Sequence, residues 1–141
     1  MTPDARTKLK TLLVQHEYYR QFIYTNNNGS ISIGFGRNLT ERGISINEAF
    51  YLLDDDISYF NNKLNHYLHF FGHITENRQI ALIDMCFDLG ILGLLNFKKM
   101  IAALEIYNYE LAAHELLDSE LARKHPERAA CIANIIKTGE L

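Results

Sequence analysis

The first residue with a chemical role to consider is Glu17, which is followed after eight residues by Asn26 and after five more by Ser32. A carboxylic acid can donate a proton to a substrate, and a hydroxyl can position a water molecule. A carboxamide such as that of Asn26 has no useful basicity. Taken alone, a single glutamate of this kind is better explained as an ordinary surface carboxylate, so its surroundings must decide.

The residues before Glu17 predict the element that carries it. Side chains at helical spacing predict an amphipathic helix over residues 4–16, with Glu17 at its C-terminal end. A carboxylate there opposes the helix dipole and costs stability, which asks for a functional reason. The side chains that set this spacing are Leu9, Leu12, Leu13 and His16.

Asn26 and Ser32 fall in a predicted hairpin. Residues 22–24 and 31–33 indicate two short strands, and residues 26–29 supply side chains that tolerate positive φ in the turn between them. Gly34, Gly36 and Gly43 then interrupt regular structure.

The rest of the chain predicts helices. Ser45 and Glu48 form a capping box at the start of a helix of about twenty residues. A central helix, apolar nearly all round, is capped by Thr75 and ends at Gly90, and Gly93 separates it from the next. The helices expected after it are Leu94–Glu105, one from about Asn108 to Leu117, and Pro126–Ile136, with Gly139 as the stop.

Composition limits the classes of protein. The 141 residues, 48% of them hydrophobic, fit one globular domain with a net charge of −3 and no basic run, which argues against a nucleic-acid partner. We see no export signal and no apolar stretch long enough for a membrane span. Cys86 and Cys131 are expected to be free buried thiols, and a metal site at the histidines is not favoured. Those histidines are His66, His69 and His73.

The spacing of Glu17, Asn26 and Ser32, followed by Ile33-Gly34-Phe35-Gly36, resembles the motif of the phage-type lysozymes, the muramidases of glycoside hydrolase family 24. In that motif, Glu is followed after eight residues by Asp, or in some members Cys, and after five more by a Thr-Ile-Gly-x-Gly segment. The likeness extends over about residues 9–140 and implies a lysozyme-like α+β fold. Further segments fall in the family's order: Arg37-Asn38-Leu39, Arg42-Gly43-Ile44-Ser45, Asp88-Leu89-Gly90, Gly93–Met100, Leu117-Asp118-Ser119, Arg128-Ala129 and Lys137-Thr138-Gly139.

The resemblance implies a role for each matching residue. Glu17 matches the general acid that protonates the glycosidic oxygen between N-acetylmuramic acid and N-acetylglucosamine, and Ser32 matches a threonine that holds the attacking water. Arg128 matches the arginine that pairs with the acid. Phe87 matches an aromatic residue that lines the substrate cleft, although a plain core position explains it as well. Tyr18 departs from the family, which usually has glycine directly after the acid.

Asn26 departs from the family at the second catalytic position, where an inverting enzyme needs a carboxylate to activate water. Three explanations remain open. The protein is a weak lysozyme that uses a different carboxylate, or a wall-binding homologue without turnover, or it carries an introduced Asp-to-Asn substitution that traps substrate.

The sequence therefore predicts one lysozyme-like domain over residues 1–141, with an N-terminal lobe at about 1–44, an interlobe helix at 45–66 and a helical lobe at 67–141. We expect a muramidase-type endolysin acting on bacterial peptidoglycan in a cleft between the lobes. The alternative is an inactive peptidoglycan-binding protein.

No metal or organic cofactor is implied. We expect a monomer that stays in the cytoplasm until it is released to the cell wall. Basic side chains that could contact the wall polymer, or simply be solvated, are Arg78, Lys98, Lys99, Arg123 and Lys124.

Overall fold

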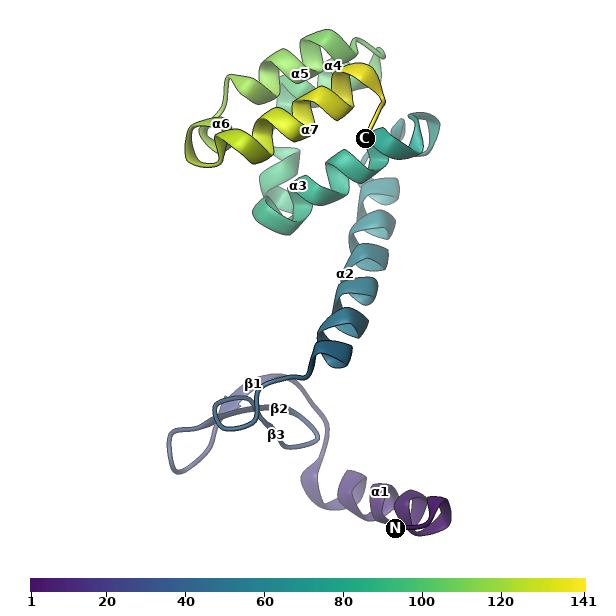
Figure 1. Cartoon of the computed structure of the whole chain (residues 1–141), viewed down its shortest axis with the longest axis vertical. Coiled ribbons are helices and arrows are strands. Elements are labelled where there is room, and N and C mark those ends of the chain that lie inside the picture. Colours follow the sequence, from purple (N-terminus) through teal and green to yellow (C-terminus); the bar gives the residue numbers. More distant parts are fainter. The chain divides into compact units, whose positions relative to one another are not determined.

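The computed structural model describes all 141 residues, which divide into two compact units, Met1–Leu52 and Leu53–Leu141 (Figure 1). Strands occur only in the first unit, whereas the second consists of helices and their connections. This content confirms the α+β class that the sequence predicts. The helix α2, Ile46–Tyr67, begins in the first unit and ends in the second.

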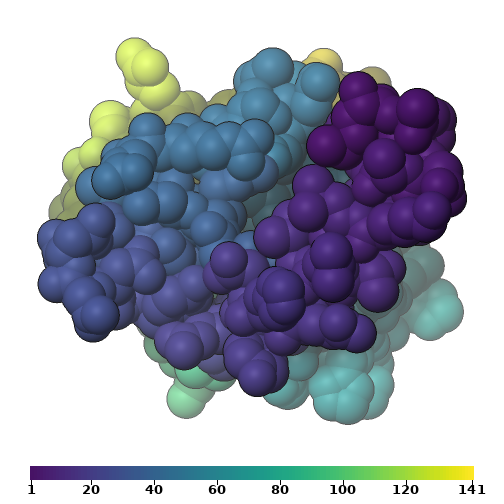
Figure 2. Space-filling model, turned by 90° about the horizontal axis from the view of Figure 1, so that it is seen from below, coloured from purple at the N-terminus to yellow at the C-terminus, as the bar shows by residue number.

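The first unit opens with α1, Pro3–Glu17. Its start is fixed by Thr2, whose side-chain oxygen accepts a hydrogen bond of 3.2 Å from the backbone nitrogen of Ala5, and by the proline that follows Thr2. The helix is the predicted one, but none of its residues is buried. Figure 2 shows this part of the surface, with α1 in purple, open to view.

A three-stranded antiparallel sheet follows α1, in the order β1 (Arg20–Thr25), β2 (Ile31–Gly34) and β3 (Arg37–Asn38). The predicted hairpin is therefore present, and its turn closes with a hydrogen bond of 2.8 Å from Asn26 N to Ser30 O. The two-residue strand β3 was not predicted from the sequence. It pairs Asn38 with Ser32, which makes β2 the central strand.

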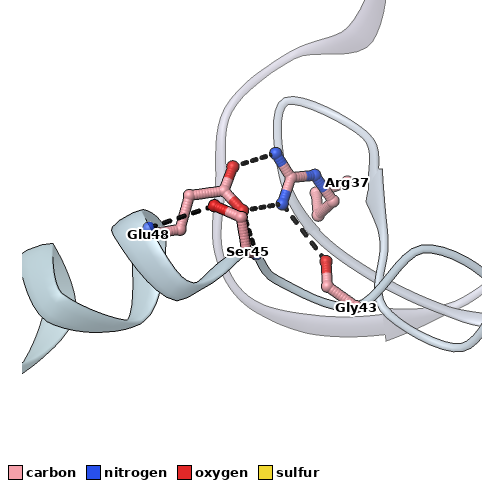
Figure 3. A network of polar contacts seen from close by, with 4 residues as sticks. All are labelled: Arg37, Gly43, Ser45 and Glu48. Carbon is pink, nitrogen blue, oxygen red and sulfur yellow. Dashed lines mark hydrogen bonds and ion pairs between the residues drawn. The ribbon is translucent and has the colours of Figure 1, made fainter.

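The start of α2 has the predicted capping box. Ser45 N donates to the Glu48 carboxylate at 2.7 Å, and Glu48 N donates to Ser45 Oγ at 3.2 Å. Arg37, on β3, binds the same carboxylate with both terminal nitrogens and also donates to Gly43 O at 3.2 Å (Figure 3). The hydrogen bonds from Arg37 lower the pKa of Glu48 to about 2, and the pKa of Arg37 is raised in turn. This network joins the sheet to α2 within the first unit.

The second unit contains the rest of α2, a 3-10 turn and five further helices. The elements that agree with the sequence include α5, which is capped by the side chain of Asn108, and α7, which has Pro126 in its first turn and ends at left-handed Gly139. Thr75 precedes α3 as expected, but its side chain makes no capping hydrogen bond. The turn η1 and the helix α6 were not predicted. The bounds are η1 Phe71–His73, α3 Glu76–Leu95, α4 Lys98–Glu105, α5 Tyr109–Leu117, α6 Glu120–Lys124 and α7 Pro126–Thr138.

The predicted break at Gly93 is wrong, because α3 continues through Gly93 to Leu95. The predicted end of the central helix at Gly90 is confirmed as a break, because the backbone there is non-helical, with φ of 70° and ψ of 171°. A Cβ atom at Gly93 would lie 2.8 Å from the Cβ of Leu89, so glycine allows the chain to pack tightly just after this kink. The chain then leaves the helix at Asn96 and Phe97 and enters α4.

All buried hydrophobic side chains lie in the second unit, from Leu64 onward. Arg78 is buried beside them, which excludes the surface role considered for it. Its Nε donates to Ile136 O at 2.7 Å, and its guanidinium lies 3.5 Å from the centre of the Tyr109 ring. Arg78 therefore joins the start of α3 to the end of α7. The largest fully buried side chains are Leu64, Phe71, Leu82, Met85, Cys86, Leu94, Met100, Leu104, Leu116, Ile132 and Ile136.

Both cysteines are free thiols, as predicted, but only Cys86 is buried, and the expectation of a buried Cys131 is wrong. Cys131 lies on α7, whose inward face is taken by Ile132, Ile135 and Ile136. Burial raises the pKa of the Cys86 thiol to about 11.

None of the helices combines the length and the apolar content that a membrane-spanning segment would need by itself. Only α3 and α4 taken together reach that length and composition, and the chain bends by 93° between them.

Candidate active site

The predicted acid, Glu17, is the last residue of α1, and its carboxylate lies against Gly36. A Cβ atom added to Gly36 would lie 2.9 Å from Glu17 Oε2 and 3.3 Å from its Cδ. Any other residue at position 36 would therefore push the carboxylate away. Glu17 is exposed and makes no hydrogen bond or ion pair within the first unit.

The backbone conformation explains why Gly34 and Gly36 are glycines. They connect β2 to β3 with φ of 69° at Gly34 and 80° at Gly36, values that favour glycine. Gly36 thus serves twice, because it turns the chain and leaves room for Glu17. A hollow of about 540 Å³ adjoins this turn, lined among others by Phe35, Arg42 and Tyr51.

The chain leaves α1 through Tyr18, whose φ of 56° and ψ of 147° form a combination rarely adopted by residues other than glycine. The backbone of Tyr18 is therefore strained. This residue directly follows the predicted acid, so the strain lies at the candidate site.

Asn26 and Ser32, predicted as the second catalytic residue and the water-positioning residue, are in contact. Asn26 Nδ2 donates to Ser32 Oγ at 2.8 Å and to Ser30 Oγ at 3.0 Å. Ser32 is 3% exposed and Ser30 is 6% exposed. The amide of Asn26 acts here as a donor to two hydroxyls, and it offers neither a negative charge nor a base.

Ser30 belongs to this site but was not singled out from the sequence. Its hydroxyl donates to Asn28 Oδ1 at 2.6 Å and accepts from Asn38 Nδ2 at 3.2 Å. The signal that could have found it is the alternation Ser30-x-Ser32, which places both side chains on the same face of a strand. Neighbouring hydroxyls and amides therefore fix the orientation of Asn26.

Arg128 lies on α7 and is held by two carboxylates of α3. Its Nε donates to Asp84 Oδ1 at 2.8 Å, its Nη2 donates to Asp84 O at 2.9 Å, and its Nη1 lies 3.9 Å from Asp88 Oδ1. The sequence did not predict either aspartate as a partner. The pairing of Arg128 with Glu17, which belongs to the first unit, stays a prediction.

Phe87 lies on α3 and is 39% exposed, with its ring centre 5.2 Å from that of Phe60 in an edge-to-face contact. The Phe87 ring is therefore packed on one side, as a core residue is, and exposed on another, as a residue that lines a cleft is. Contact of Phe87 with a sugar stays a prediction.

The surface of the second unit is hollowed next to Arg128. A hollow of about 360 Å³ is lined by Arg128, His125 and their neighbours, and one of about 290 Å³ is lined by Asp88, Phe97 and His125. His125 borders both hollows, so they adjoin. Polar and charged side chains in these hollows can hydrogen-bond to a polyhydroxylated ligand.

The histidines considered as metal ligands do not gather. His66 lies in α2, His73 ends η1, and no group of three or more histidine, cysteine or carboxylate side chains is arranged to hold a metal ion.

Comparison with known proteins decides the family. The sequence profile described as phage lysozyme matches residues 14–129, most of the chain. The chain belongs to the phage lysozyme family. Its small antiparallel sheet near the N-terminus, followed by helices, is the lysozyme-like fold predicted from the sequence.

Two relatives of the chain come from Dictyostelium discoideum. Probable T4-type lysozyme 2 is 24% identical over 164 aligned residues and covers 96% of each chain. Probable T4-type lysozyme 1 is 28% identical over 71 residues, covering 50% of this chain and 42% of its own length. Membership of the phage lysozyme family implies a lysozyme-type function, that of a glycoside hydrolase with peptidoglycan as substrate.

The strained backbone at Tyr18 now has a context in the phage lysozyme family. The resemblance implies glycine directly after the acid, and glycine adopts the observed φ of 56° without penalty. This chain keeps a backbone suited to glycine while carrying a tyrosine.

Proposed function

We propose that the protein is a lysozyme that hydrolyses the β-1,4 bond between N-acetylmuramic acid and N-acetylglucosamine in bacterial peptidoglycan. The observation that carries this proposal is Glu17, exposed at the end of α1 and seated against Gly36, in a chain of the phage lysozyme family. Glu17 is the proton donor to the glycosidic oxygen, since cleavage needs an acid at the leaving group.

The other predicted residues assist this step. Ser32 holds the attacking water through its hydroxyl, Arg128 supports Glu17, and Phe87 contacts the sugar. We further propose the inverting course, in which water attacks from the face opposite the acid and a gap of about 6.5–9.5 Å between the two catalytic groups admits it. Asn26 occupies the second position and orients this water only by hydrogen bonding.

Asn26 is expected to slow the reaction. Loss of one catalytic electrostatic group costs about two to three powers of ten in rate in other enzymes. A weak lysozyme would instead use a carboxylate other than position 26 to activate the water.

The alternative function is a peptidoglycan-binding protein without turnover. The observation that favours it is the amide of Asn26, which is satisfied by Ser30 and Ser32 and leaves no base at the site. We also propose that the protein acts as a monomer and stays in the cytoplasm until it gains access to the wall.

The test is the release of reducing ends from purified peptidoglycan, with mass spectrometry of the products. Hydrolysis of the proposed bond leaves N-acetylmuramic acid at the new reducing end. Glu17→Gln should abolish the release, whereas the matched control Glu41→Gln, at an exposed acid in the same unit, should not. Co-sedimentation with the wall polymer without any release would favour the binding protein, and release by Glu17→Gln would contradict the role of Glu17.

A further inference from the structure

The segment that follows Glu17 is joined to the Gly34–Gly36 turn by an aromatic contact. The ring centres of Tyr19 and Phe35 lie 5.6 Å apart, with an angle of 46° between the ring planes. Tyr19 is two residues after Glu17, and Phe35 directly precedes Gly36. The contact therefore lies next to the place where the Glu17 carboxylate approaches Gly36.

Few other contacts fix this end of the helix. No residue of α1 is buried, and Glu17 makes no hydrogen bond or ion pair within its unit. The backbone pairing of β1 with β2 begins at Arg20, opposite Gly34, and its register is irregular between Arg20 and Tyr24. Apart from the approach of its own carboxylate to Gly36, the contact between Tyr19 and Phe35 is the side-chain contact nearest to Glu17 in the sequence.

The strain at Tyr18 needs such a link. A residue in a sparsely populated backbone conformation stays there only when its surroundings hold it. Tyr18 lies between Glu17 and Tyr19, so an anchored Tyr19 ring and a seated Glu17 carboxylate hold both sides of the strained residue.

We infer that Tyr19 and Phe35 form a positioning pair that holds the Glu17 carboxylate over Gly36. The inference rests on the proposed function, in which Glu17 is the acid. Neither aromatic residue touches the reacting atoms. They act through Glu17, by fixing where the helix end meets the turn. A displacement of about 1 Å at a catalytic group can cost about a hundredfold in rate, so a modest contact has a large effect on turnover.

The exposure of Tyr19 and Phe35 distinguishes a positioning role from a role in the hydrophobic core. Tyr19 is 65% exposed and Phe35 is 50% exposed, so truncation of either leaves no buried cavity. Phe22, on β1, is 75% exposed and has no aromatic partner, which makes it a matched control for the loss of an aromatic ring.

The experiment compares Tyr19→Ala, Phe35→Ala, Tyr19→Phe and the control Phe22→Ala in the full chain. The first readout is the nuclear Overhauser effect between the Glu17 side-chain protons and Gly36 Hα, which does not depend on activity. We expect this signal in the unsubstituted protein, in Tyr19→Phe and in Phe22→Ala, and we expect its loss in the two alanine variants of the pair.

The second readout is kcat and KM for peptidoglycan. We expect kcat to fall about ten- to a hundredfold in the two alanine variants, with KM unchanged and with rescue by Tyr19→Phe. A Glu17–Gly36 signal that persists in Tyr19→Ala overturns the positioning pair, whatever the activity. If the signal follows the prediction but no variant or parent protein cleaves the wall, the proposed function is wrong, whereas the pair still positions Glu17.

Discussion

At the scale of single residues, the site combines one exposed carboxylate, Glu17, with the hydrogen-bonded amide of Asn26. Glu17 makes no polar contact within its unit, while Asn26 donates to two buried or nearly buried hydroxyls. An aspartate at position 26 would accept from the Ser32 hydroxyl and would lose the donation to Ser30. Asn26→Asp therefore adds a negative charge while the size and shape of the side chain stay nearly the same.

Tyr18→Gly should stabilise the protein. The observed backbone conformation strains a tyrosine by about 1–3 kcal/mol, and the extra freedom of glycine in the unfolded chain offsets about 0.5–1 kcal/mol of the relief. We expect a net gain of about 1 kcal/mol in the free energy of unfolding, measured by urea denaturation. Tyr18→Ala is the matched control, because it also removes the exposed ring but keeps the Cβ and hence the strain. Equal stability of the two variants would contradict the strain.

The two thiols should differ sharply in reactivity. The pKa of Cys86 is raised to about 11 by burial, so only about one thiol in a thousand is ionised at pH 8, and the side chain is also inaccessible. Iodoacetamide should therefore label the exposed Cys131 in the folded protein and leave Cys86 unlabelled until a denaturant is added. Mass spectrometry of the peptides gives the result. Rapid labelling of Cys86 without denaturant would contradict its burial.

At the scale of elements, the junction between the sheet and α2 depends on one carboxylate. Glu48 caps the helix through Ser45 and also binds Arg37 of β3, so a single side chain serves two elements (Figure 3). The Phe35–Gly36 turn, which carries the seat of Glu17, lies directly before Arg37. The ion pair therefore contributes to the position of the candidate site.

This junction should weaken in acid. The pKa of Glu48 is about 2 in the folded protein and 4.5 ordinarily, so its contribution is complete above pH 4.5 and is lost as the pH falls from about 4.5 towards 2. Glu48→Gln should lower stability at pH 7 and show a smaller difference from the parent protein near pH 2.5. Thermal unfolding followed by circular dichroism at both pH values is the measurement.

Glu41→Gln is the control for the acid dependence, because Glu41 is exposed and its carboxylate has no partner in the first unit. Its stability should differ little from that of the parent protein, because the substitution removes no contact of the first unit. A difference between Glu48→Gln and the parent protein that is as large at pH 2.5 as at pH 7 would show that the ionised carboxylate is not the stabilising form.

At the scale of the whole molecule, the two units differ in how they are stabilised. All buried hydrophobic residues lie in the second unit, while the first depends on backbone pairing, polar networks and exposed aromatic contacts. Burial of apolar surface is the main favourable term in folding.

Residues 45–141, which retain the capping box of α2, should therefore fold alone with a cooperative thermal transition. Residues 1–44 should not fold alone, because they bury no apolar side chain. Circular dichroism of the two fragments tests this expectation. Stable structure in the isolated N-terminal fragment would contradict it.

Much of this fold could be predicted from the sequence where the interactions are local. The capping box of Ser45 and Glu48, the Asn108 cap and the Gly139 stop each depend on residues within one turn, so their patterns are visible in the sequence. The hairpin was predicted for the same reason. The Gly93 break was misplaced, because glycine there serves close packing against Leu89 rather than a chain reversal.

The features that could not be predicted from the sequence depend on partners that are distant in the chain. Strand β3 has two residues and exists only through its pairing with β2. The Asp84 partner of Arg128 lies 44 positions away, and nothing in its local sequence marks it. Ser30 belongs to the site through its hydrogen bonds with Asn28 and Asn38, which form only when the hairpin and β3 are in place. The family motif found Glu17, Asn26 and Ser32 but gave no reason for the orientation of the amide.

The central claim is that Glu17 donates the proton and that position 26 limits the rate. The most direct measurement is reducing-end release by the parent protein, Asn26→Asp, Glu17→Gln and the double variant. We predict a gain of about a hundredfold or more for Asn26→Asp, and no release by either protein that carries Glu17→Gln. Cleavage that survives Glu17→Gln in the Asn26→Asp background would contradict the account.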